Sequence, residues 1–72
     1  MSSIIRVKGL LYNGCTMSEV LNQLASDPNN TLFKDQPLII QINGKLVIAS
    51  DYDHVLINAN DEIIIMPLMA GG

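Results

Sequence analysis

Near its N-terminus the chain alternates apolar and polar side chains, as a half-buried strand does. In residues 4–8, Ile5 and Val7 fall on one face. Gly9 permits a turn, after which residues 10–12 can return as a second strand. We therefore expect the chain to open with a β-hairpin.

A helix is predicted to begin after Thr16. Thr16 and Glu19 have the spacing of a capping box, in which the Glu19 amide donates to the threonine hydroxyl and the glutamate side chain reaches back. The apolar residues that follow recur at helical spacing and form one stripe that should face a sheet: Met17, Val20, Leu21 and Leu24. Ser26-Asp27-Pro28 ends the helix, and residues 29–36 are expected to form a loop.

Two strands joined by a tight turn are predicted for residues 38–48, because Asn43-Gly44 readily adopts the positive φ angles of a type I′ turn. Residues 50–54 are polar, as in one helical turn. The last strand is apolar throughout Ile63-Ile64-Ile65, as expected of a central strand. Pro67 lacks a backbone donor, so the strand should end at or just before it.

These elements predict an α+β domain in which one main helix packs on a mixed sheet of four to five strands. A parallel pairing with the first strand would place the last strand in the centre. The order of strand, strand, helix, strand, strand, strand resembles that of ubiquitin-like β-grasp domains. We expect one domain over residues 1–67 and a flexible tail over residues 68–72.

Composition narrows the range of partners. The net charge is −3 with only four basic residues, which argues against a nucleic-acid partner and an anionic membrane. Cys15 is the single cysteine, so it has no internal disulfide partner, and we expect no metal site. The chain shows no signal-peptide pattern and no apolar run long enough to cross a bilayer, so we expect a cytoplasmic protein.

The C-terminal residues carry the strongest candidate chemistry. Gly71 and Gly72 have no Cβ to obstruct a narrow channel, and Ala70 before them is also small. Residues 68–72 could reach roughly 16 Å at ~3.3 Å per residue, far enough to enter the active site of another protein. We therefore interpret the Gly72 carboxylate as the reactive group.

Three apolar residues flank this tail and are predicted to dock on a partner: Met66, Leu68 and Met69. Methionine adapts to irregular surfaces, and 49% of the residues are hydrophobic in a chain too short to bury them all. Cys15 and His54 are reactive residue types, but we interpret the first as an inert turn cysteine and the second as a solvated surface histidine.

The chain resembles the bacterial and archaeal sulfur carriers, small β-grasp proteins that end in Gly-Gly. The pattern of the carriers of thiamine thiazole synthesis, the ThiS branch, is matched at its usual spacing over thirty residues: Asn43-Gly44, Val47, Ser50, Tyr52, Asp61 and Gly71-Gly72. The chain departs from that pattern at Ile48-Ala49, where Pro-Arg is usual, and at Asn60, where glycine is usual. A second branch, the small subunit of molybdopterin synthase or MoaD branch, is favoured by Pro67 and by the longer loop of residues 27–36.

The resemblance implies a protein cosubstrate rather than an enzyme. An adenylating enzyme of the ubiquitin-activating type would use ATP to activate Gly72, and a persulfide donor would convert it to a thiocarboxylate. Thiazole synthase or the molybdopterin synthase large subunit would then accept the sulfur, and the chain itself would bind no cofactor. Two alternatives remain open: a ubiquitin-like modifier joined to lysines through Gly72, and a β-grasp interaction domain whose Gly-Gly end is accidental.

Overall fold

The computed structural model of the chain describes residues 4–28 and 37–68. In this part of the chain, four strands, one α-helix and two short 3-10 helices follow one another. Their bounds, in chain order, are β1 (Ile5–Lys8), η1 (Gly9–Tyr12), α1 (Met17–Ala25), β2 (Leu38–Ile42), β3 (Lys45–Val47), η3 (Ala49–Asp51) and β4 (Glu62–Pro67).

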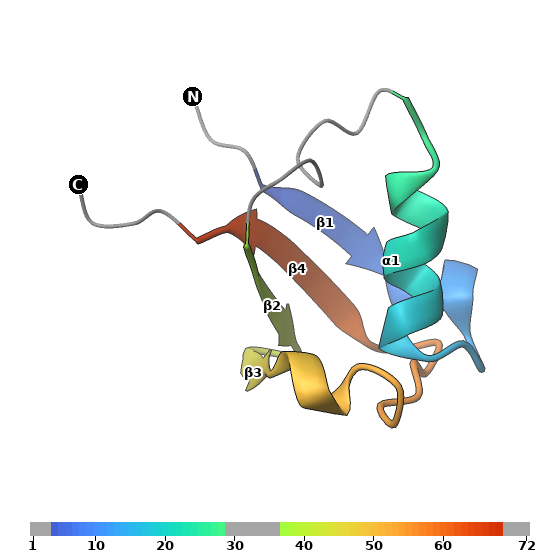
Figure 1. Ribbon diagram of the computed structural model, residues 1–72. Helices are drawn as coiled ribbons and strands as arrows, with labels where there is room; N and C mark the ends of the chain where they lie inside the picture. The colour runs from blue at the N-terminus through green and yellow to red at the C-terminus, as the bar shows by residue number, and fades with distance from the viewer. Residues whose placement is uncertain (1–3, 29–36, 69–72) are drawn as a thin grey trace.

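The strands form one sheet in the order β1-β4-β2-β3, and α1 packs against one of its faces (Figure 1). This arrangement confirms the predicted α+β class and the ubiquitin-like β-grasp architecture of one main helix on one sheet. The prediction that the last strand is central is also confirmed, since β4 pairs with β1 on one side and with β2 on the other.

The strand directions differ from the prediction. All three pairings are antiparallel, so the described sheet is not mixed, and β1 does not run parallel to β4. The reason lies at Gly9, whose N–H donates to the Asp61 carbonyl at 2.8 Å and thereby fixes the end of β1 beside the start of β4. A Cβ at Gly9 would lie 2.0 Å from the Asn58 carbonyl oxygen, so this close approach requires glycine.

The predicted N-terminal hairpin is wrong as well. Residues 10–12 do not return as a strand but belong to η1. The chain is already turning towards α1 here, because the Cys15 N–H donates to the Tyr12 carbonyl and the Gly14 N–H donates to the Ile57 carbonyl, each at 2.9 Å. As a result, β1 is an outer strand of the sheet (Figure 1).

Helix α1 begins and ends where the sequence predicted. The Thr16 hydroxyl accepts a hydrogen bond from the Glu19 amide, and the Glu19 carboxylate accepts one from the Thr16 amide, so the capping box is complete. The helix ends at Ala25, with Ser26 as its C-cap. The loop predicted for residues 29–36 lies outside the described residues.

The hairpin of β2 and β3 also confirms its prediction. Asn43 and Gly44 have φ angles of 54° and 82°, the positive values that a type I′ turn requires at both central positions. The polar stretch after β3 contains η3 and the turn that follows it, close to the helical turn predicted there.

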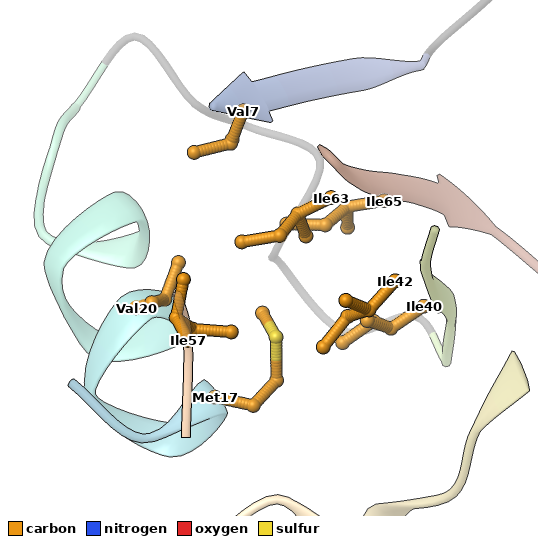
Figure 2. Close-up of a cluster of buried hydrophobic side chains, with 8 residues drawn as sticks. All are labelled: Val7, Met17, Val20, Ile40, Ile42, Ile57, Ile63 and Ile65. Carbon is orange, nitrogen blue, oxygen red and sulfur yellow. The ribbon is translucent and has the colours of Figure 1, made fainter. Parts of the chain in front are cut away.

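The described residues form one apolar core between the sheet and α1. Figure 2 shows its eight buried side chains converging from the strands, the helix and the loop before β4: Val7, Met17, Val20, Ile40, Ile42, Ile57, Ile63 and Ile65. The helical stripe predicted to face the sheet does so, with Leu21 and Leu24 half-buried at the edge of the core. Ile57 carries no periodic signal in the sequence, yet it is 1% exposed, because its N–H donates to the Cys15 carbonyl and holds it under the helix.

A hydrogen-bond network joins the Asn43-Gly44 turn to the start of β4. The Asn43 side-chain amide donates to Asp61 Oδ1 at 2.8 Å, while the Glu62 N–H donates to Asn43 Oδ1 at 3.0 Å. The other Asp61 oxygen accepts from the Asn58 N–H at 2.8 Å. This network fixes the register of β4 relative to the hairpin.

We expect Asn43→Ala to lower the free energy of unfolding by roughly 2–4 kcal/mol, because it removes two side-chain hydrogen bonds and places alanine at a positive φ. Urea denaturation monitored by circular dichroism measures this change. Asn60→Ala is the matched control, since Asn60 is exposed in the neighbouring turn, and it should stay within about 0.5 kcal/mol of the parent. Equal effects of the two variants would show that the network does not hold β4 in place.

Candidate functional site

The predicted reactive end of the chain lies outside the described residues. This applies to Gly72, Gly71 and Ala70, and also to Met69 of the predicted docking group. The structure does describe β4 and Leu68, and therefore the route by which the chain leaves the sheet.

Pro67 ends β4 without disturbing its pairing with β2. On the β2 side the hydrogen bonds involve even-numbered residues of this segment: Glu62 accepts from the Asn43 N–H, and the Leu68 N–H donates to the Pro37 carbonyl, each at 2.9 Å. The missing N–H of Pro67 therefore faces away from β2. The prediction that the strand ends at this proline is confirmed, and one further hydrogen bond holds Leu68 at the exit.

Strand β4 is apolar on both faces, although α1 covers only one. Ile63 and Ile65 point into the core and are fully buried, so Ile64 and Met66 point to the opposite face, where they are only half-buried. We call this second side of the sheet the open face. The predicted docking residues Met66 and Leu68 both belong to it by strand alternation, and Leu68 is 51% exposed.

The open face carries a row of apolar residues next to the exit. Ile39 lies directly opposite Met66 in the pairing of β2 with β4. Continuing the other two pairings by one residue places Ile4 on the far side of Met66 and Ile48 on the far side of Ile39. We call these four residues, Ile4, Ile39, Ile48 and Met66, the exit row; Ile4 and Ile48 are 46% and 55% exposed.

Polarity on the open face increases with distance from the exit. In the next row across the sheet, Arg6 and Gln41 flank Ile64 on either side. In the row after that, Lys8 lies opposite Glu62. Leu46, which is 65% exposed, lies beyond Gln41 in the same row as Ile64. The open face is therefore apolar across all four strands only in the row where β4 ends.

The sequence identified only part of this surface. Met66 and Leu68 were found because they adjoin the tail, whereas Ile4, Ile39 and Ile48 were missed. The signal for two of them was present: once Asn43-Gly44 is assigned as a two-residue turn, counting back along both strands pairs Ile39 with Ile48. Ile4 could not be placed in the same way, because its neighbour is 62 residues further along the chain.

The other reactive residue types lie elsewhere. Cys15 is half-buried in the turn before α1, and His54 is exposed in the turn after η3. The Ser18 hydroxyl donates to Asp53, and the Tyr52 carbonyl accepts from the Ser18 N–H, so these bonds hold the turn after η3 against the start of α1.

Burial raises the pKa of the Tyr52 hydroxyl above its ordinary value. In residues 4–28 and 37–68, no three His, Cys, Asp or Glu side chains come together as a metal site.

The fold and the exit together define a ubiquitin-like β-grasp domain whose last strand leaves the sheet beside an apolar surface. The sequence profile of the ThiS family matches residues 5–72, almost the whole chain. The chain therefore belongs to the ThiS family, within the superfamily of ThiS and MoaD sulfur carriers. No curated protein and no solved structure gives a significant match.

Membership of this family gives the chain a general role. ThiS-family proteins are small sulfur carriers rather than catalysts, and they work with adenylating enzymes and sulfur-accepting enzymes. Over the described residues, the helix is too short to cross a membrane.

Proposed function

We propose that the chain carries sulfur on its C-terminal Gly72 as a thiocarboxylate and delivers it to the synthesis of the thiazole of thiamine. The observation that carries this proposal is the ThiS-family match, which runs through Gly71 and Gly72 to the last residue. The described structure supports it by showing that β4 ends at Pro67, five residues before that carboxylate, beside the exit row.

The proposed chemistry needs two partners. A carboxylate is a poor electrophile, because its leaving group would be oxide. In the first step, the Gly72 carboxylate attacks the α-phosphorus of ATP bound to an adenylating enzyme; an acyl-adenylate forms and pyrophosphate leaves. A persulfide sulfur then attacks the acyl carbon and AMP leaves. A thiol finally cleaves the resulting acyl disulfide, which leaves the thiocarboxylate on Gly72.

In this proposal the partner enzymes bind the ATP and supply the persulfide, and the chain only carries the sulfur. The sequence has no phosphate-binding loop of the G-x-x-x-x-G-K-[ST] type. The carrier's contribution is to bind its partners and to present the carboxylate. We propose that the exit row and Leu68 form the surface on which the adenylating enzyme docks, because these residues are apolar, open to solvent and adjacent to the tail.

Thiazole synthesis is favoured over molybdopterin synthesis by the spacing from Asn43 to Asp61. The side chains of these two residues are hydrogen-bonded to each other, so a change in the length of the intervening segment would alter the hairpin offered to the acceptor enzyme. Pro67 is the observation that favours the molybdopterin branch. It restricts only the angle at which the chain leaves β4, so we give it less weight.

Deletion of Gly72 should abolish adenylation by the cognate activating enzyme, because it moves the carboxylate out of reach of the ATP α-phosphate. ATP–pyrophosphate exchange measures this step, and the thermal unfolding curve should remain nearly unchanged, since terminal residues contribute little to stability. Cys15→Ser tests whether the cysteine carries the sulfur instead, and we expect this variant to retain full sulfur transfer. A truncated protein that is still activated would remove the central proposal.

Replacement of an exposed residue of the exit row, or of Leu68, by aspartate should weaken docking of the adenylating enzyme without changing the Gly72 carboxylate. For Ile48→Asp and Leu68→Asp, we expect kcat/KM in the exchange assay to fall by about tenfold or more, with kcat little changed, because a charge must be desolvated in the interface. Leu11→Asp is the matched control: Leu11 is 77% exposed but lies on η1, away from the open face. An equal loss in Leu11→Asp would exclude the exit row as the docking surface.

The acceptor is tested with the thiocarboxylate form, after intact mass has confirmed that sulfur has replaced oxygen at Gly72. The protein is offered separately to thiazole synthase and to the molybdopterin synthase large subunit, and we expect sulfur to be consumed only by the former. Sulfur consumption only by the molybdopterin synthase large subunit would assign the chain to the molybdopterin branch and would leave the sulfur-carrier role intact. Consumption by neither, with conjugates of the chain in cell lysate, would instead indicate a protein modifier.

A further inference from the structure

Among the residues that the structure describes, strand β1 has one unpaired edge. Its only partner within the described part of the chain is β4. The bond from the Gly9 N–H to Asp61 and the pairing of Val7 with Ile63 show that odd-numbered residues bond to β4. The N–H and C=O of Arg6 and the N–H of Lys8 therefore point outward, while the Lys8 carbonyl begins η1 as its N-cap. Such a row of outward groups can receive another strand.

The same edge carries positive charge. Arg6 and Lys8 are exposed, and because they are two residues apart their side chains lie on one face of the strand. Neither forms an ion pair with another residue that the structure describes, and the nearest charged residue in the register is Glu62, opposite Lys8. Two of the four basic residues of a chain with a net charge of −3 are thus placed on one four-residue strand.

We propose that the β1 edge binds an extended acidic segment of a partner protein as an additional strand. Backbone groups of Arg6 and Lys8 would hold the segment, and carboxylates two residues apart on it would face the two basic side chains. An apolar residue at one end would lie beside Ile4, which is 46% exposed. The β1 edge meets the exit row at Ile4, but the inference rests on the backbone groups and charges of β1 and does not depend on the proposed function.

A second copy of the chain fits this edge less well than an acidic segment. In a symmetric antiparallel pair centred on Arg6, this residue would lie directly opposite the Arg6 of the other copy, and in a pair centred on Val7 it would lie opposite Lys8 of the other copy. Like charges placed directly opposite each other destabilise strand pairing. Charged residues on an outer strand are also a common means of preventing self-association, which leaves a partner of opposite charge as the complementary occupant.

The test uses the ¹⁵N-labelled full chain and a capped six-residue peptide of alternating valine and glutamate. We expect saturable shifts of the β1 amides and slower hydrogen exchange at the Arg6 and Lys8 amides, since both N–H groups point outward in the free protein. The same peptide with lysine in place of glutamate should not bind. Binding of both peptides alike, or shifts centred on β3, the other outer strand, would overturn the proposal.

Variants of the protein separate charge from fold. Arg6→Glu combined with Lys8→Glu should lower the affinity of the protein for the acidic peptide by about tenfold or more. The matched control is Lys45→Glu, because Lys45 is an exposed residue of β3, and this variant should bind the peptide nearly as the parent protein does. If the double variant does not fold, the comparison of the glutamate peptide with the lysine peptide on the parent protein still tests the proposal. Protection of the Arg6 and Lys8 amides that rises with protein concentration without peptide would instead identify a second copy as the occupant and overturn the inference.

Discussion

The central position of β4 is the constraint on which the rest of the structure depends. Its residues pair on both sides, so its two faces are set by its neighbours: Ile63 and Ile65 are directed into the core, and Ile64 and Met66 onto the open face. A shift of one residue in either pairing would exchange these two sets and expose the most buried side chains of the chain. The same register that builds the core therefore also builds the exit row.

Asp61 holds this strand in register from three directions. Its carbonyl accepts from Gly9 and thereby positions β1, while its carboxylate accepts from Asn43 and Asn58. The segment just before β4 is thus tied to β1, to the hairpin turn and to its own loop.

Local signals predicted most elements, whereas long-range pairing did not follow from them. The capping box of Thr16 and the Asn43-Gly44 turn each depend on a few adjacent residues, and both were predicted correctly. The direction of β1 depends on the contact of Gly9 with Asp61, which are far apart in sequence, and no periodicity reports such a contact. Of the four residues of the exit row, only Met66 was predicted, because it adjoins the tail, whereas Ile4 joins the row only through the long-range pairing of β1 with β4.

One helix cannot cover both faces of a four-stranded sheet, and a domain of this size buries only about 60% of the surface of its unfolded chain. The apolar residues left on the open face are therefore available for binding. Covering the four side chains of the exit row would contribute on the order of 1 kcal/mol each to the binding free energy. Ile4 belongs to the exit row and also lies at the start of the β1 edge. A strand added at that edge would extend the row sideways, whereas an enzyme on the open face approaches perpendicular to the sheet. The two surfaces thus meet at Ile4 but are approached from different directions, so a partner bound at the edge need not displace one bound on the open face.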